Sequence, residues 1–331
     1  MNYIGSKHKL TAFIRSVISQ KVPDLQGKVF AELFGGTGVI ARSFKPEVKQ
    51  VIINDLEPYS YVLSRNYIGN HRPLNFAESV QELNALPPKK GFIYEHYCAG
   101  SGSGRMYFSD ENGLKIDAMR LQIHEWKASQ TIDDDHYYFL LASLIESADK
   151  VANTASVYGA FLKKIKPSAQ KNLVLNPALF TVNDHAHQVF NRDANELIKE
   201  IKGDILYLDP PYNERQYGAN YHLLNTIALY DDFIPKGKTG LREYERSNYC
   251  KTNQVETAFE ELIRHADFSH IFISYNNEGL MNEQTVADIL SHYGHYELAT
   301  TQYQRFKADT DANRSHKATS TLEYLHILVK S

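Results

Sequence analysis

The sequence predicts an α/β protein in which a long, mainly helical insert interrupts a sheet. Two apolar runs indicate buried strands: residues 28–33, before a glycine-rich turn, and residues 204–208, before an acid and two prolines. Between them the alternation of strand and helix stops, because about 130 residues separate Asp55 from the next strand-like run, whereas one strand–helix–strand unit takes about 30. We therefore expect a sheet domain made of residues 1–70 and 185–331, with residues 71–184 inserted.

Composition indicates an ordinary globular protein of about two domains, with 331 residues of which 43% are hydrophobic and 23% charged. The net charge of −3 means that any contact with nucleic acid has to come from a local basic surface. Two cysteines, Cys98 and Cys250, give neither a disulfide framework nor a four-ligand zinc pattern. Because no apolar run is long enough for a membrane span and the start lacks a signal peptide, we expect a cytoplasmic protein.

The N-terminal segment predicts a helix that begins near Lys7. Apolar residues recur at helical spacing from Leu10 to Ile18, and Ser6 can cap the start. A lysine at a helix N-terminus is poorly placed for the helix dipole. We therefore expect Lys7 to face an anionic group, the alternative being a solvated surface lysine.

A strand, a glycine turn and a helix follow one another in residues 28–44. Glycines in the turn, residues 34–38, allow positive φ angles and a close approach of the backbone to a ligand. The next strand, residues 51–53, ends near Asp55, which lies 19 residues beyond Gly36, the offset of an acid that holds a ribose. This stretch predicts a site for an adenosine-containing cofactor, the alternative being a tight turn without a ligand.

The spacing of apolar residues in the insert predicts two long helices, around residues 116–126 and 136–152, whose apolar stripes pack against each other. Basic and aromatic residues alternate in it, as they do on surfaces that bind nucleic acid, although an ordinary helical face would look similar. Together with basic loops later in the chain, the candidates for DNA contact are Arg105, Lys127, Lys163, Lys164, Arg215, Lys236, Lys238, Arg314 and Lys317.

After the insert, strands are predicted at residues 187–190, 204–208, 270–275 and 322–329, and helices at residues 197–201 and 222–230. Asp193 follows the first of these strands. Asp209-Pro210-Pro211-Tyr212 follows the second, where proline stops the sheet ladder and holds the acid at the strand's carboxyl end, the edge at which open sheets bind ligands. Scattered histidine pairs have no third partner, so no metal site is expected.

In this order the motifs resemble those of the Dam-like, alpha-group adenine-specific DNA methyltransferases. The resemblance is carried by residues 3–7 (Tyr-Ile-Gly-Ser-Lys), residues 34–38 (Phe-Gly-Gly-Thr-Gly), Asp55 and the Asp209–Tyr212 tetrad, with the long insert ahead of the tetrad. The family often has tryptophan where this chain has Tyr3. The resemblance implies a Rossmann-like sheet that binds S-adenosylmethionine, an inserted target recognition domain at residues 71–184, and a double-stranded DNA substrate.

The resemblance also implies roles for individual residues. Asp209 and the Pro210 carbonyl would hold the exocyclic amine of a flipped-out adenine, and Pro211 and Tyr212 would complete the catalytic site, with Tyr212 stacked on the base. The implied cofactor-binding residues are Tyr3, Lys7, Phe34, Gly35, Gly36, Thr37, Gly38, Asp55, Asp193 and Asp209. A restriction-modification system with a cognate endonuclease is the expected context. The alternatives are an RNA base methyltransferase, a nicotinamide dehydrogenase and a non-catalytic DNA-binding module.

Overall fold

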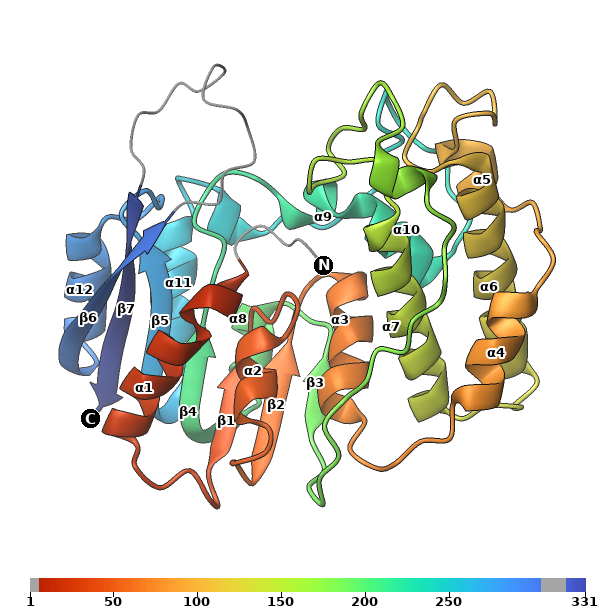
Figure 1. Ribbon diagram of the computed structural model, residues 1–331. Coiled ribbons are helices and arrows are strands. Elements are labelled where there is room, and N and C mark those ends of the chain that lie inside the picture. The colour runs from red at the N-terminus through yellow and green to blue at the C-terminus, as the bar shows by residue number, and fades with distance from the viewer. Residues whose placement is uncertain (1–5, 305–319) are drawn as a thin grey trace. The chain divides into compact units, whose positions relative to one another are not determined.

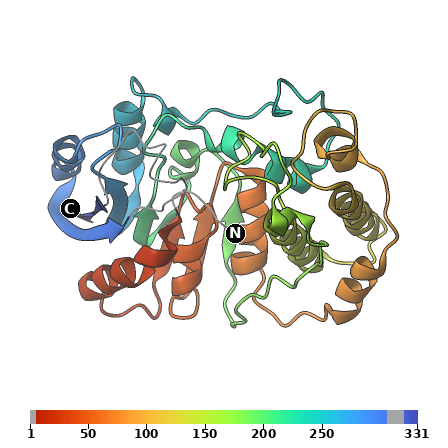
Figure 2. The same cartoon turned by 45° about the horizontal axis from the view of Figure 1, so that its top comes forward.

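The computed structural model describes residues 6–304 and 320–331, which form two compact units. The first, here called the sheet unit, comprises Ser6–Leu56, His185–Gln216 and the described part of Arg246–Ser331. The second, the helical unit, comprises Glu57–Asp184 and Tyr217–Glu245. Each unit is assembled from segments that lie far apart in the sequence, as the colours of Figure 1 and Figure 2 show.

The described strands of the sheet unit follow the order β3-β2-β1-β4-β5-β7-β6 (Figure 1). The first five run parallel, whereas β7 is antiparallel to both of its neighbours. The order reverses between β1 and β4, and at such a point the carboxyl ends of parallel strands bind ligands. The strands are β1 Val29–Glu32, β2 Gln50–Asn54, β3 Gln188–Phe190, β4 Lys202–Leu208, β5 Asp267–Asn276, β6 Gly294–Gln304 and β7 Ser320–Lys330.

Both faces of this sheet are covered, which explains why the buried parts of its central strands are mostly apolar. Neighbouring residues on β1 point to opposite faces. Phe30 stacks on Phe44 with 4.6 Å between ring centroids, while Ala31 belongs to a core that includes Leu262. The described helical segments of this unit are η1 Lys7–Leu10, α1 Thr11–Lys21, α2 Val39–Phe44, α8 Ala194–Leu197, η4 Asn248–Cys250, α11 Val255–His265 and α12 Glu283–Ser291.

The strands predicted from apolar runs are all present, within a few residues of their expected ends. The prediction missed β6, because this strand pairs with β7 alone and its sequence mixes His295, Glu297 and Thr300 with few apolar residues. The helix expected at residues 197–201 is wrong in its bounds. It occupies Ala194–Leu197 instead, because β4 begins at Lys202 and the chain has to turn before it.

The helical unit has one continuous hydrophobic core. Its two long helices, α6 and α7, pack against each other as their apolar spacing predicts. The described helical segments are α3 Pro58–Ser64, the π-helical turn η2 Arg65–Gly69, α4 Ala77–Ala85, α5 Phe92–Tyr97, α6 Asp110–Ala128, α7 Asp134–Lys150, η3 Pro167–Gln170, α9 Tyr217–Asn220 and α10 His222–Leu229.

The bounds of the units differ from the bounds expected for the domains, since residues 57–70 and 217–245 pack with the insert. Buried side chains explain this. Asn225 of α10 accepts a hydrogen bond from the Tyr59 amide at 3.0 Å and donates one to Glu57 Oε2 at 2.6 Å. Arg120 of α6 donates from Nε to the Ile227 carbonyl at 2.9 Å, near the carboxyl end of α10. The sequence pattern contains no trace of these long-range pairs.

The described helices include none that is both long enough and apolar enough to cross a membrane. Cys98 and Cys250 are both buried. Within the described ranges, 6–304 and 320–331, no group of three or more His, Cys, Asp or Glu side chains is placed to hold a metal ion.

Candidate active site

Asp209-Pro210-Pro211-Tyr212 begins immediately after β4, at the carboxyl edge of the sheet next to the switch point. Pro210 is buried. The Tyr212 carbonyl accepts a hydrogen bond from the Leu280 amide at 2.9 Å, and its ring stands edge-on to Tyr275 with 6.3 Å between centroids. The tetrad is therefore held by its strand on one side and by the loop after β5 on the other.

Lys7 faces an anion, as expected from its place at a helix N-terminus, and that anion is Asp209. The Ser6 hydroxyl accepts from the His8 amide and caps η1, which fixes the backbone at Lys7. Lys7 Nζ lies 2.9 Å from Asp209 Oδ1, and the two side chains are 6% and 17% exposed. The same ammonium lies 5.5 Å from the centroid of the Tyr212 ring. Lys7, Asp209 and Tyr212 thus form one cluster.

Burial and charge act in opposite directions on this ion pair. Burial lowers the pKa of Lys7, but Asp209, Tyr212 and Glu323 together raise it above its ordinary value, so the ammonium stays charged. Burial raises the pKa of Asp209, and the opposing effect of Lys7 does not fully offset it. Asp209 Oδ1 is buried and faces the Lys7 ammonium, and a carboxylate oxygen has a second lone pair for a further donor. Such an oxygen suits a hydrogen-bond donor on a ligand.

Two further buried carboxylates surround the pair, and the sequence interpretation missed both. Glu32, the last residue of β1, accepts from the Ala41 amide at 2.8 Å, and burial together with Asp209 and Asp55 raises its pKa. Glu323 on β7 also has a raised pKa, mainly because it is buried. A lone acid within an apolar strand is the signal that could have identified each of them, since burying an unpaired charge is costly.

The glycine turn after β1 has the geometry that its sequence predicts. Gly36 and Gly38 have φ angles of 53° and 67°, and Gly38 is the N-cap of α2. A Cβ on Gly35 would lie 2.9 Å from the Ile53 side chain, so a larger residue there would require that side chain to shift. The Gly36 amide donates to Asp55 Oδ2 at 2.6 Å, which joins the turn to the carboxyl end of β2.

Asn54 was not expected at the site, yet it connects three strand ends. Its side-chain amide donates to the Leu33 and Arg192 carbonyls at 3.1 and 3.0 Å, and its oxygen accepts from the Arg192 amide at 3.0 Å. The residues after β1, β2 and β3 are consequently held in one arrangement. Asn54 is buried, and its role depends on contacts that only the folded sheet creates.

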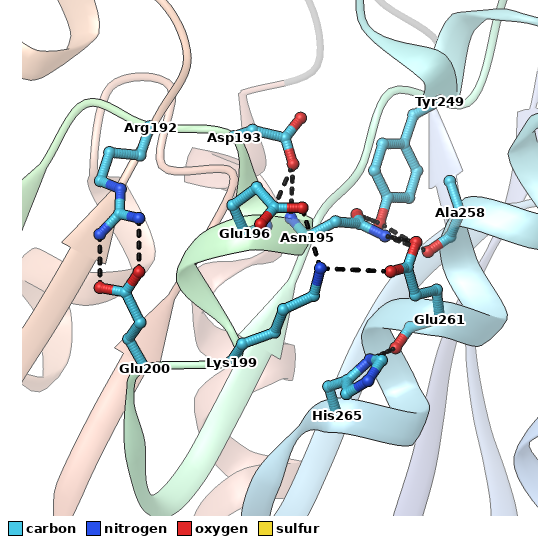
Figure 3. Close-up of polar contacts among 10 residues, drawn as sticks. All are labelled: Arg192, Asp193, Asn195, Glu196, Lys199, Glu200, Tyr249, Ala258, Glu261 and His265. Atoms are coloured by element: carbon cyan, nitrogen blue, oxygen red, sulfur yellow. Dashed lines mark hydrogen bonds and ion pairs between the residues drawn. The ribbon is translucent and has the colours of Figure 1, made fainter.

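Asp193 lies at the carboxyl end of β3 and caps α8 (Figure 3). Its Oδ1 accepts from the Asn195 and Glu196 amides at 2.8 and 3.2 Å, while the other carboxylate oxygen points away from the helix. Asn195 is fixed in turn by the Tyr249 hydroxyl at 2.8 Å and by the Ala258 carbonyl at 2.8 Å. The Tyr249 ring stands edge-on to Phe34, with 4.9 Å between centroids.

The chemistry of this edge fits an adenosine-containing cofactor that carries a carboxylate. Asp55 and Asp193 provide carboxylate oxygens for hydroxyl and amine donors, the glycine turn allows close backbone approach, and Phe34 provides an aromatic face. Lys7 is the buried cation of the cluster. Tyr3, the remaining predicted cofactor contact, lies outside the described residues.

The structure separates the cations predicted to bind DNA into two groups. Three of them are engaged within the protein: Lys127 pairs with Asp134, Lys236 pairs with Glu243, and Arg105 donates to the carbonyls of His96, Pro235 and Gly237. The second group is exposed and has no described carboxylate within 4.0 Å; it consists of Lys163, Lys164, Arg215 and Lys238. Arg314 and Lys317 lie outside the described residues.

Residues 3–289 match the family described as D12 class N6 adenine-specific DNA methyltransferase. The chain is 64% identical to the Type II methyltransferase M.NlaIII of Neisseria lactamica over the full length of both proteins. It is 38% identical to M.CviAII of Paramecium bursaria Chlorella virus 1 over 94% of each chain, and 38% identical to M.FokI of Planomicrobium okeanokoites, of which it covers 53%. The chain therefore belongs to the D12 class N6 adenine-specific DNA methyltransferases, not to the RNA base methyltransferases, nicotinamide dehydrogenases or non-catalytic DNA-binding modules.

Proposed function

We propose that Asp209-Pro210-Pro211-Tyr212 is the catalytic tetrad of this DNA adenine methyltransferase. The observation that carries the proposal is the buried Asp209 Oδ1, which faces the Lys7 ammonium at 2.9 Å and lies directly after the carboxyl end of β4. An adenine amine is a poor nucleophile because its lone pair is delocalised into the ring. Asp209 and the Pro210 carbonyl each accept one N–H of this amine, which favours a pyramidal nitrogen with its lone pair free to react.

Asp209 also receives a proton in this account. S-adenosylmethionine, when bound, supplies a methyl group whose bond to sulfur breaks as the bond to the amine nitrogen forms. The amine then has one proton too many, and Asp209, which accepts one of its N–H bonds in this proposal, takes that proton. Burial raises the pKa of Asp209 above that of a free aspartate, so the carboxylate is a better proton acceptor than an exposed one.

Tyr212 binds the target base, which has to leave the duplex to be reached. Extrusion of a base costs a few kcal/mol in lost pairing and stacking, and stacking on an aromatic ring offsets part of this cost. The Tyr212 ring is suited to the task because Tyr275 stands edge-on to it and the Leu280 amide holds the Tyr212 backbone carbonyl. The nearby Lys7 ammonium adds a cation close to the ring.

The remaining predicted residues each bind a different part of the cofactor. Asp55 accepts from the ribose hydroxyls, and Asp193 accepts from the adenine amine through its outward oxygen. Phe34 packs on the cofactor's adenosine part, with its ring held by Tyr249. Lys7 binds the cofactor carboxylate while keeping its contact with Asp209, and Gly35, Gly36, Thr37 and Gly38 let the backbone approach the ligand.

The chain further fits the Dam-like alpha arrangement, supported by the order of its motifs: the Lys7 segment, the glycine turn, the long insert, and then the tetrad. In this arrangement the helical unit acts as the target recognition domain and the sheet unit as the catalytic domain. A role in restriction-modification, beside a cognate endonuclease that acts at the same site without direct contact, is supported by the Type II methyltransferases to which the chain is similar. A cytoplasmic location would follow from its DNA substrate.

Modified-base sequencing tests this proposal. DNA from a host that expresses the chain should contain N6-methyladenine at one sequence, and DNA from a host that expresses Asp209→Ala should not. Glu214→Ala is the matched control, because it removes an exposed acid a few residues further along the same loop. Equal methylation by the Asp209→Ala variant would refute the catalytic role of Asp209, whereas loss of methylation in both variants would mean that the loop, not the carboxylate, is essential.

A further inference from the structure

One segment of the helical unit has a charge pattern unlike that of the rest of the chain. Residues 150–183, here called the acid-free segment, contain five lysines and neither Asp nor Glu, although acids outnumber basic residues in the whole chain by 39 to 36. Asp149 and Asp184 mark its two ends. An acid-free run with several lysines is a local source of positive potential in a protein whose net charge is negative.

Two of the five lysines have roles within the protein. Lys166 donates from Nζ to the Thr154 carbonyl at 2.6 Å, and Lys150 lies in the last turn of α7, where a cation stabilises the helix dipole. Lys163, Lys164 and Lys171 are exposed, and no described carboxylate lies within 4.0 Å of them. These three ammonium groups are therefore available to an external anion.

The backbone that carries Lys163 and Lys164 is held in place by a buried side chain. Asn153 donates from Nδ2 to the Met106 and Leu162 carbonyls at 2.8 and 2.9 Å, and its Oδ1 accepts from the Lys166 amide at 3.0 Å. Since Asn153 is fully buried, its three bonds fasten both sides of the lysine pair to the interior of the unit.

A second anchor, Tyr158, lies between Asn153 and the lysine pair. Tyr158 is fully buried, and its hydroxyl donates to Asp149 Oδ1 at 2.9 Å. Its carbonyl accepts from the Tyr107 hydroxyl at 2.6 Å. Between the anchors, Ser156 has a φ angle of 125°, a region that residues other than glycine rarely adopt and that persists only where surrounding contacts enforce it. The lysines thus project from a loop with a defined conformation.

We infer that Lys163, Lys164 and Lys171 of the acid-free segment contact the phosphate backbone of the DNA substrate. The inference rests on the DNA methyltransferase function and names the surface that provides sequence-independent affinity. DNA presents a dense row of negative charges, and each lysine that neutralises a phosphate releases a counterion. The three lysines carry charges that no described carboxylate neutralises, and they project from a backbone with a defined conformation. In contrast, Lys127, Lys236 and Arg105 bind groups of the protein itself.

The test compares two variants with the same change in net charge. Lys163→Ala/Lys164→Ala removes two lysines of the acid-free segment, and Lys89→Ala/Lys90→Ala removes two adjacent exposed lysines elsewhere in the helical unit. The dissociation constant for a DNA duplex that the wild-type enzyme methylates is measured between about 50 and 200 mM salt. The melting temperature of each variant checks that it is folded.

The first variant should bind more weakly, and its plot of log affinity against log salt should be less steep by about 1.8, because each phosphate contact contributes about 0.9. The control variant should keep the wild-type slope and the wild-type methylation rate. An unchanged slope in the first variant, or an equal change in both variants, would overturn the inference. Failure of the proposed function would be seen separately, as an Asp209→Ala variant that methylates this duplex at the wild-type rate.

Discussion

Two groups of charges differ in both burial and pairing. One surrounds Asp209 in the sheet unit, and the other belongs to the acid-free segment of the helical unit. Lys7 is 6% exposed and pairs with a buried carboxylate at 2.9 Å, while Glu32 and Glu323 add further buried acids nearby. Lys163 and Lys164 are exposed and have no described carboxylate partner. Buried, paired charges hold one geometry, as methyl transfer requires, whereas exposed and unpaired charges can bind phosphates of any sequence.

Among the four single variants proposed here, Asp209→Asn should cause the largest change, a loss of kcat. Asparagine keeps the size and one acceptor oxygen but loses the charge and the ability to take a proton, so kcat should fall by at least about 100-fold, the loss typical of one essential polar group in an active site. The salt dependence of DNA binding should stay close to that of the wild type. A tritiated methyl-transfer assay at saturating DNA measures the first quantity and a binding titration the second; a kcat within a factor of about two of the wild type would contradict the assignment.

Lys7→Met should come next, because it leaves Asp209 buried without its cation. Removing one partner of a buried pair typically costs about 3–5 kcal/mol of stability. Lys7 lowers the pKa of Asp209, so its loss should raise that pKa further. Since Asp209 has to be ionised, activity is lost as pH falls through this pKa, and the acid limb of the kcat profile should move to higher pH. Urea unfolding and a pH profile of kcat test the two effects, and an acid limb that does not move would show that Lys7 does not act through Asp209.

Glu32→Gln should change the stability less than Lys7→Met does, and it should raise the stability instead of lowering it. The folded pKa of Glu32 is raised, so ionising it opposes folding once the pH exceeds the ordinary value of 4.5. Glutamine still accepts from the Ala41 amide but carries no charge. The variant should gain on the order of 1 kcal/mol at pH 8 and less at pH 5. Urea unfolding at both pH values provides the measurement, and a loss of stability that is larger at pH 8 than at pH 5 would mean that the charge of Glu32 stabilises the fold.

Lys127→Ala should have the smallest effect. Lys127 is a basic residue of the helical unit like Lys163, but it pairs with Asp134, so it has no free charge to offer a phosphate. The salt slope of DNA binding should change by much less than about 0.9, the value for one lost contact. A change as large as that expected for one lysine of the acid-free segment would show that pairing does not decide which lysines bind DNA.

Much of the sheet unit was predictable because its signals are local. Apolar runs such as residues 204–208 end where the strands end, and the glycine turn and the tetrad each contain their own stop signal. The helical unit was less predictable. Asn225 bonds to Glu57 and Tyr59 from more than 160 positions away, and these bonds place residues 217–245 in a unit that no local pattern indicates.

The candidate site shows the same division between local and long-range information. Asp55 and Asp209 were predicted because each directly follows a strand. Asn54, Tyr249 and Glu323 were missed because their importance depends on partners brought by other strands and loops. Among the lysines, the sequence could not separate Lys127 from Lys163, because the ion pair of Lys127 with Asp134 joins two helices.

The most direct test of the account measures kcat and the salt slope of DNA binding in parallel for Asp209→Asn and for Lys163→Ala/Lys164→Ala. We expect Asp209→Asn to lose kcat by at least about 100-fold with little change in slope. The lysine variant should lose about 1.8 units of slope, with its kinetic defect mainly in KM for DNA. If both variants changed the slope and kcat in the same proportion, catalysis and phosphate binding would not be carried by separate charge clusters, and the central claim would be wrong.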